Sequence, residues 1–123
     1  MCVFLLSFIT VDADSRMAIG HAGHTVSLPC HTNLTTAVDW TYKQSAATNE
    51  VEVCVGGRIL QSHYRTRFSL VSANPGEYNL VLSDVQSTDS GTYTCIEDAG
   101  VGLRHPIQLR VIGKSDNKSF YTL

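Results

Sequence analysis

The sequence predicts an all-β domain in which two sheets pack face to face. Its 123 residues are enough for one domain with a working core. Short runs rich in Val, Ile, Tyr, Phe and Thr are interrupted by Gly, Asn, Asp and Ser, which is typical of strands separated by turns. About eight or nine such runs follow one another at near-regular spacing, without helical periodicity. This pattern indicates a two-sheet sandwich.

Alternation of apolar and polar residues gives the strand candidates in chain order. They cover residues 16–19, 26–30, 38–42, 50–55, 67–71, 78–82, 91–95 and 107–111. The polar or glycine-rich segments 31–37, 43–49 and 96–106 are expected to be turns or loops, and residues 58–65 to be irregular. Asn74-Pro75-Gly76 is a strong turn signal between two of the strands.

Residues 89–95 combine a corner, a tyrosine and a cysteine. Asp89, Ser90 and Gly91 are turn residues, and alternation from Gly91 onward places Tyr93 and Cys95 on one face. A tyrosine two residues before a cysteine, directly after a corner, is the arrangement called a tyrosine corner. The corner gives Asp89 and Ser90 a structural explanation.

Composition and motifs do not favour catalysis, metal binding or nucleic-acid binding. The formal net charge is −2, so no global field recruits nucleic acid or an anionic membrane. No G-x-S-x-G elbow surrounds Ser90, and no phosphate-binding loop is present. His21 and His24 flank a bend, but no further ligands complete a metal site. We therefore expect neither an enzyme nor a cofactor, and no apolar run is long enough to span a bilayer.

Cysteines and glycosylation sequons favour an extracellular protein. The four cysteines Cys2, Cys30, Cys54 and Cys95 form no C-x-x-C pair, which argues against a zinc ribbon or a thioredoxin-type site. Asn33 and Asn117 each begin an Asn-x-Ser/Thr triplet and are candidate glycosylation sites. With a disulfide, these triplets favour a secreted protein or the ectodomain of a surface protein.

The two ends of the chain are expected to lie outside the domain proper. Residues 1–11 are either the remnant of a secretory leader or an N-terminal edge strand, because an apolar run lacks the basic residues of a leader. Residues 12–112 form the domain, and residues 113–123 form a polar tail or linker.

Residues 12–112 resemble the immunoglobulin superfamily, specifically its V-set. The motifs that carry the resemblance are Gly23-x-x-Val26-x-Leu28-x-Cys30, Trp40, Arg67-Phe68-Ser69-Leu70, Leu80-x-Leu82-x-x-Val85 and Asp89-Ser90-Gly91-x-Tyr93-x-Cys95. The resemblance implies an antiparallel V-type sandwich with Greek-key topology, in which extra strands between Trp40 and Leu80 join the sheet of Trp40 and Cys95.

The resemblance also implies the structural residues of the core. Cys30 and Cys95 would form the inter-sheet disulfide, worth about 4 kcal/mol in the chain-entropy model, with Trp40 packed on it. Arg67 would pair with Asp89 at the bottom of the sandwich.

One departure narrows the kind of V-set protein. Antigen-receptor V domains carry an aromatic residue before a Gly-x-Gly motif ahead of the last strand, whereas Ala99 precedes Gly100-Val101-Gly102 here. A germline-encoded receptor fits better than a rearranging one. Similar modules occur in invertebrate chitin-binding V-region proteins, fish immune-type receptors and butyrophilin-like surface proteins.

The expected function is recognition by a secreted or cell-surface immune-type receptor, with a protein or glycan as ligand. One candidate surface is the loop end, with Asn33, Glu97, Asp98, Arg104 and His105. The other is the outer sheet face, with Thr41, Lys43, Glu52, Cys54, Thr94 and Ile96. Pairing through that face would give a homodimer or heterodimer. A homophilic adhesion module and a carbohydrate-binding lectin module are the alternatives.

Two residues of the outer face carry specific expectations. Alternation in residues 51–55 places Cys54 outward with Glu52, where it is either a free thiol or bonded to Cys2 or to another chain. Ile96 is the apolar residue of that face without a place in the core, which makes it the expected anchor for a partner.

Overall fold

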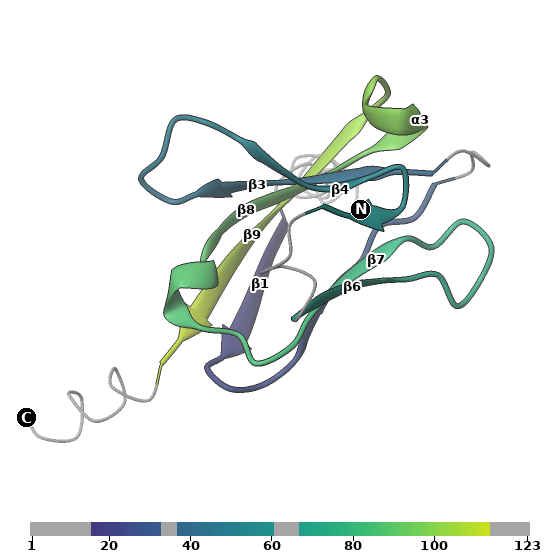
Figure 1. Ribbon diagram of the computed structural model, residues 1–123. Helices are drawn as coiled ribbons and strands as arrows, with labels where there is room; N and C mark the ends of the chain where they lie inside the picture. The colour runs from purple at the N-terminus through teal and green to yellow at the C-terminus, as the bar shows by residue number, and fades with distance from the viewer. Residues whose placement is uncertain (1–15, 33–36, 61–66, 114–123) are drawn as a thin grey trace, which may run out of the picture.

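The computed structural model describes residues 16–32, 37–60 and 67–113 and consists of two β-sheets packed face to face (Figure 1). The elements in chain order are β1 (Arg16–His21), β2 (Val26–Leu28), β3 (Asp39–Gln44), β4 (Val51–Val55), β5 (Arg58–Ile59), β6 (Phe68–Val71), β7 (Asn79–Leu82), the 3₁₀ turn η1 (Ser87–Asp89), β8 (Gly91–Ile96), α3 (Glu97–Gly100) and β9 (Arg104–Ile112). The predicted all-β sandwich is confirmed. Only single helical turns interrupt the strands of the described residues.

The strand order is that of a V-type sandwich. One sheet has the order β1-β9-β8-β3-β4-β5 and the other has the order β2-β7-β6. The additional strands β4 and β5 therefore extend the sheet that carries Trp40 and Cys95, as the V-type prediction requires. The short strand β5 lies in a segment that the sequence pattern left irregular.

One strand pair departs from the antiparallel expectation. β1 pairs with β9 in parallel, with Arg16 opposite Ile107 and Ile19 opposite Arg110. Both strands run toward the end of the sandwich that lies away from α3 (Figure 1). There the chain leaves β1 through a bend, in which the Ala22 amide donates to the Ile112 carbonyl over 2.9 Å, and enters β2 in the other sheet.

The core between the sheets is built around a disulfide and a tryptophan. Cys30 and Cys95 are bonded, with 6.3 Å between their Cα atoms, which confirms the predicted pairing. Trp40 is fully buried, and its indole Nε1 donates to the Tyr78 carbonyl over 3.0 Å. This bond satisfies the one polar group that the ring carries into the core. The remaining fully buried side chains around it include Leu28, Val38, Val53, Leu80, Leu82 and Val85.

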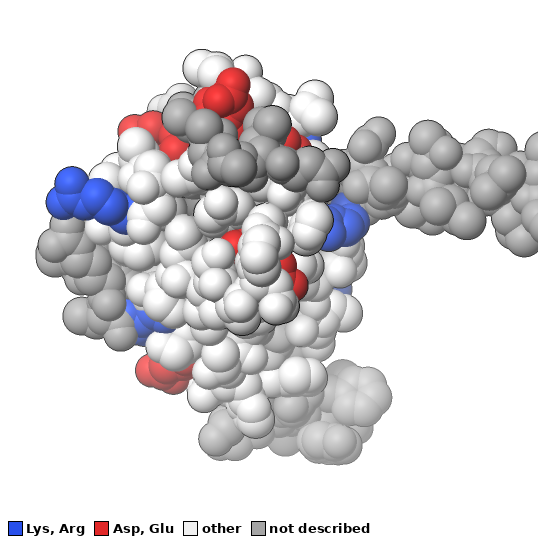
Figure 2. All heavy atoms as spheres, turned by 90° about the vertical axis from the view of Figure 1, so that its right-hand side faces the viewer, with Lys and Arg blue, Asp and Glu red and all other residues white. Residues whose placement is uncertain are grey.

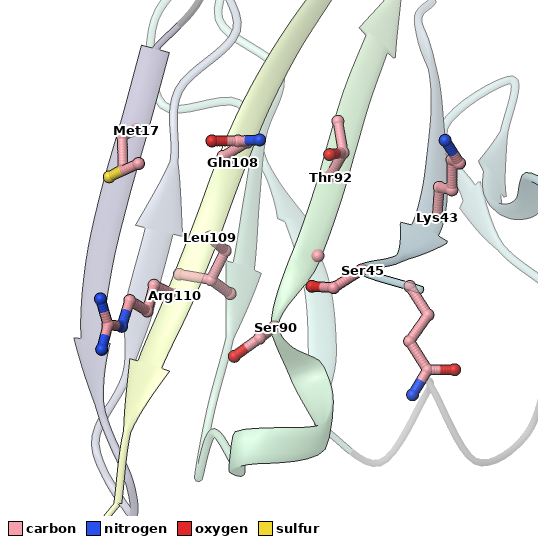
Figure 3. A pocket seen from close by; sticks show the side chains of 10 residues that line it. Met17, Lys43, Ser45, Ser90, Thr92, Gln108, Leu109 and Arg110 are labelled. Carbon is pink, nitrogen blue, oxygen red and sulfur yellow. The ribbon is translucent and has the colours of Figure 1, made fainter. Parts of the chain in front are cut away.

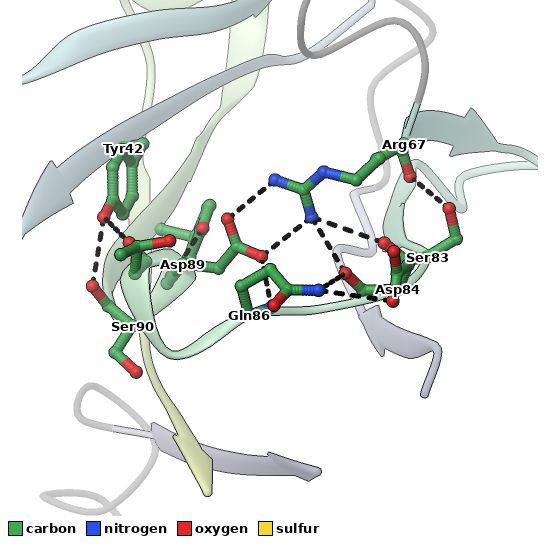
Figure 4. A network of polar contacts seen from close by, with 9 residues as sticks. Tyr42, Arg67, Ser83, Asp84, Gln86, Asp89 and Ser90 are labelled. Atoms are coloured by element: carbon green, nitrogen blue, oxygen red, sulfur yellow. Dashed lines mark hydrogen bonds and ion pairs between the residues drawn. The ribbon is translucent and has the colours of Figure 1, made fainter. Parts of the chain in front are cut away.

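The corner before β8 is held by side chains that bond to the backbone (Figure 4). The buried Tyr93 hydroxyl donates to the Asp89 carbonyl over 2.7 Å, the bond that defines a tyrosine corner. The Ser90 hydroxyl accepts from the Val111 amide over 2.9 Å. The Tyr42 hydroxyl lies 3.0 Å from the carbonyls of both Thr88 and Ser90. Asp89 and Ser90 thus have structural roles, as expected from the sequence.

The outward orientation predicted for Cys54 is wrong. Trp40 lies opposite Cys54 and Thr41 lies opposite Glu52, so Val53 is an extra residue in β4. Such a bulge reverses the alternation beyond it, because side chains change face when one residue is inserted. Cys54 therefore lies on the same side as Trp40, fully buried and without a disulfide partner among the described residues. Burial raises the pKa of its thiol to about 11.

Candidate functional site

The upper part of the outer sheet face is covered rather than open. Thr41 and Thr94 lie opposite each other on β3 and β8, and only 6% and 3% of their surfaces are exposed. The Thr41 hydroxyl donates to Glu50 Oε2 over 3.2 Å, and Arg104 Nη2 lies 2.5 Å from the same oxygen. Because Arg104 is on β9 and Glu50 precedes β4, this ion pair reaches across β8 and β3. Two threonines expected to contact a partner are thereby shielded from it.

Ile96 is not the exposed anchor that the sequence predicted. Only 5% of its surface is exposed. It ends β8 between Asp39 on β3 and Arg104 on β9, and α3 begins at the next residue and packs against β3. The turn of the chain into α3 therefore covers the position that strand alternation left open.

Two of the residues predicted on the outer sheet face are exposed and can contact a partner. Lys43 and Glu52 are both exposed, on the neighbouring strands β3 and β4. Of the six residues expected on the face, these two alone are exposed; Cys54 faces the core and the other three are covered.

The loop end is organised by the Glu97 carboxylate, whose side chain is only 12% exposed. Its Oε1 accepts a hydrogen bond from the Thr32 hydroxyl over 2.8 Å, and its Oε2 lies 2.5 Å from His105 Nε2. The bonds to His105 and then to Thr32 lower the pKa of the Glu97 carboxyl below its ordinary value, because they favour the charged form. One carboxylate thus joins the segment after β2, the start of α3 and the start of β9.

The hairpin between β8 and β9 exposes two apolar side chains. Val101 is 82% exposed and Leu103 is 70% exposed. Three backbone bonds close the hairpin: the Glu97 amide donates to the Leu103 carbonyl over 2.9 Å, the Gly102 amide to the Glu97 carbonyl over 2.9 Å, and the Val101 amide to the Asp98 carbonyl over 3.2 Å. We call residues 101–103 the hairpin tip. Its base is fixed and its apolar side chains face solvent.

The described residues of the loop end carry charges of both signs. Figure 2 views the molecule from the side on which α3 lies, and acidic and basic side chains there are separated by uncharged surface. Across residues 16–32, 37–60 and 67–113 no group of three or more His, Cys, Asp or Glu is placed to hold a metal ion. In the same ranges no helix is long and apolar enough to cross a bilayer.

Some residues singled out from the sequence lie outside the described residues. These are Cys2 and the two candidate glycosylation sites, Asn33 and Asn117. Asp98 and Arg104 are described; Asp98 is exposed with a positive φ of 53°, and Arg104 is held by Glu50.

Three features were missed from the sequence. Thr32 lies in a segment expected to be a loop, and Glu50 begins a segment expected to be a strand. Nothing in their neighbourhood indicates the partners that lie 65 and 54 positions away. Val101 and Leu103 did carry a signal, since two apolar residues in a glycine-rich loop have no strand face to fill.

The family follows from comparison with known domains. The family model described as the immunoglobulin V-set domain matches residues 14–112. The chain belongs to the immunoglobulin V-set family. V-set domains with this disulfide are typically extracellular. A search of curated proteins found no sequence that matches this V-set domain.

Solved structures share the fold at low sequence identity. The ZIG-8 IG1 homodimer matches with a TM-score of 0.67 and 18% identity, over 81% of this V-set domain's chain and 81% of its own. The first Ig domain of the mouse polymeric immunoglobulin receptor matches with a TM-score of 0.65 and 21% identity, over 80% and 91%. The voltage-gated sodium channel β4 subunit, whose extracellular domains form parallel homodimers, matches with a TM-score of 0.62 and 19% identity, over 82% and 93%.

Proposed function

We propose that this V-set domain is a non-catalytic recognition module of a secreted or cell-surface immune-type receptor, and that it binds a protein ligand with its hairpin tip. The observation that carries the proposal is the exposure of Val101 and Leu103, at 82% and 70%, on a hairpin whose base is fixed by Glu97. Neighbouring large apolar side chains left in solvent on a soluble domain mark a contact surface.

The fixed base matters for affinity. A loop that is already ordered loses little conformational entropy on binding, so more of its contact energy appears as affinity. Thr32 and His105 hold the Glu97 side chain. The Glu97 amide and carbonyl in turn make two of the backbone hydrogen bonds that fix the base of the hairpin. The family and the Cys30–Cys95 disulfide of this domain support placement outside the cell.

The proposal is tested by the double variant Val101→Ser with Leu103→Ser. The domain is presented as a tetramer to a panel of purified extracellular proteins and to intact cells. We expect a loss of at least about tenfold in binding, the cost of removing two central apolar contacts. The matched control is Val71→Ser, which removes an apolar side chain that is 40% exposed on the other sheet. Equal binding by wild type and the double variant would show that the hairpin tip is not the binding surface.

Homophilic pairing is a second candidate, since two of the structures similar in fold are described as homodimers. On this V-set domain Lys43 and Glu52 are exposed with opposite charge on adjacent strands. A two-fold axis can therefore bring Lys43 of each copy against Glu52 of the other copy. Sedimentation over a wide range of concentrations separates the candidates: a persistent monomer excludes pairing as the main activity.

A lectin role has less support. Sugar sites commonly use an exposed aromatic ring, and Trp40, the one tryptophan of the sequence, is fully buried. This alternative is tested by removing glycans enzymatically from cells that bind the tetrameric domain and then measuring the binding again.

A further inference from the structure

A shallow depression lies on the outer sheet face, at the end of the sandwich away from the hairpin tip. Its volume is about 370 Å³, and the side chains that define it come from four strands and a turn (Figure 3). Thr92 and Gln108 form its floor on β8 and β9, while Met17 on β1 and Ser45 after β3 border it. The depression is separate from the surface assigned to ligand recognition above.

Among the described residues, its ionisable lining is entirely cationic. Lys43 and Arg110 line the depression, and no carboxylate from residues 16–32, 37–60 or 67–113 does. Neither side chain has a hydrogen bond or ion pair with any described residue, and both are exposed. The whole chain carries a formal net charge of −2, so the local charge of this patch is opposite in sign to the net charge of the chain. Unpaired cations beside a depression favour an anionic occupant.

Its border is apolar on the side of β1. Met17 lines the depression and is 64% exposed. Ile19 lies outside the lining, two residues further along β1 on the same outward side, and is 58% exposed. Large apolar side chains side by side on an edge strand are costly to leave in water and mark contact surfaces. The occupant therefore offers apolar atoms as well as negative charge.

We propose that this depression binds an acidic, extended segment of a partner protein, with carboxylates on either side of an apolar side chain. Lys43 on β3 and Arg110 on β9 are separated by β8, which places their strands about 10 Å apart. Thr92 lies opposite both Lys43 and Gln108, so Arg110 is also displaced by two residues along β9. About four residues of extended chain cover the resulting separation and keep alternate side chains on one face. One carboxylate pairs with the Arg110 guanidinium and the other with the Lys43 ammonium, while the apolar side chain packs against Met17.

Two other occupants fit the surface less well. A sulfated glycan would pair with the cations but leave Met17 and Ile19 in water. A two-fold dimer centred on the depression would bring Lys43 and Arg110 of one copy close to the same cations of the other. Charge and apolar contact together favour the acidic polypeptide.

The experiment follows backbone amide resonances of the ¹⁵N-labelled full chain during titration with the capped peptide Gly-Glu-Ser-Phe-Ser-Glu-Gly, in which the two Glu and the Phe share one face of an extended chain. We expect shifts in the amide resonances of Met17, Thr92, Gln108 and Arg110, and no shifts in the resonances of the hairpin tip. The double charge reversal Lys43→Glu with Arg110→Glu is expected to weaken binding at least about tenfold. Raised salt is expected to weaken it as well. The matched control is Arg58→Glu, which reverses an exposed charge on β5 and is expected to bind like wild type.

Several outcomes would overturn the proposal. These are the absence of shifts around the depression, equal binding of the matched peptide with Lys in place of both Glu, or undiminished binding by the double variant. Saturable binding of a heparin-derived tetrasaccharide at the depression without peptide binding would assign the surface to a glycan. Shifts there that depend on protein concentration alone would assign it to a second copy. Unchanged shift dispersion in the variants excludes misfolding as the cause of lost binding.

Discussion

Arg67 and Asp89 connect the two sheets through two nearly equal hydrogen bonds, 2.8 Å from Nη1 to Oδ2 and 2.9 Å from Nη2 to Oδ1. Arg67 precedes β6 and Asp89 ends η1 before β8, so the pair bridges the sandwich at its lower end (Figure 4). Asp89 Oδ2 also accepts from the Gln86 amide over 2.8 Å. The bond to Asp89 raises the pKa of the Arg67 guanidinium, so the guanidinium stays charged.

Replacing Arg67 with Ala is expected to lower the free energy of unfolding by about 3 kcal/mol. The Asp89 side chain is 9% exposed, so its carboxylate would be left nearly buried without a counter-charge. The Arg67 side chain is 28% exposed, which puts the loss at the lower end of the range for breaking a buried pair. Urea unfolding of wild type and variant measures the difference.

The exposed pair formed by Arg104 and Glu50 supplies the comparison for this experiment. Their side chains are 50% and 37% exposed, so Arg104→Ala is expected to cost no more than about 1 kcal/mol. Equal losses for Arg67→Ala and Arg104→Ala would show that the Arg67 pair does not carry the stability assigned to it.

Cys54 is expected to resist alkylation in the folded protein. Its thiol is fully buried and its pKa is raised to about 11, so at pH 8 only on the order of one molecule in a thousand carries the reactive thiolate. The test is iodoacetamide labelling read by intact mass, in a Cys2→Ser background so that one free thiol is counted. We expect slow labelling at pH 8 and complete labelling in urea. Rapid labelling of the folded protein would contradict the burial of Cys54.

The same thiol makes stability depend on alkaline pH. A pKa raised in the folded state means that the protonated thiol is favoured by folding. Its contribution is complete below the ordinary thiol pKa of 9.0 and is lost as pH rises toward about 11. Cys54→Ala is expected to remove this part of the alkaline decline, with some loss of stability at neutral pH because a small cavity is left.

The contrast between Trp40 and Cys54 explains how far the sequence predicts this fold. Trp40 and Tyr93 could be placed because unbroken alternation determines which face each residue takes, and the disulfide could be placed because the V-set resemblance pairs Cys30 with Cys95. Cys54 could not, since one extra residue in β4 reverses the faces, and no residue in Val51–Val55 marks the bulge. Alternation predicts orientation only while the strand register is continuous.

The candidate site was less predictable for a different reason. Ile96 was placed correctly on the outward side of β8, but its cover comes from α3 and from contacts made far away in sequence. The ion pair of Glu50 with Arg104 joins residues 54 positions apart. Local patterns contain no information on such pairings, because they depend on which strands become neighbours.

Gly91 is expected to tolerate no side chain. A Cβ atom at this position would lie 2.4 Å from the Lys43 carbonyl oxygen and 2.8 Å from Tyr42 Cε1, where β8 passes close to β3. The first of these neighbours is backbone and cannot rotate away. Gly91→Ala is therefore expected to cost about 2 to 3 kcal/mol in urea unfolding. Gly23→Ala is the control: its φ of 87° strains a side chain, but no atom lies within 4 Å, so about 1 kcal/mol is expected. Equal costs would mean that β8 can move away from β3.

Glu97 is expected to make the stability of the domain depend on acid pH. Its carboxyl pKa is lowered in the folded state by His105 and Thr32, so folding favours the charged form. The contribution is complete above the ordinary carboxyl pKa of 4.5 and is lost as pH falls through the lower folded value. The side chain in Glu97→Gln does not ionise. The variant is therefore expected to have a lower free energy of unfolding at pH 7 and a flatter decline of that free energy below pH 4.5. Urea midpoints measured from neutral to acid pH test this, with Glu52→Gln on the exposed sheet face as control. An acid decline as steep in Glu97→Gln as in wild type would mean that the carboxylate does not hold the base of the hairpin.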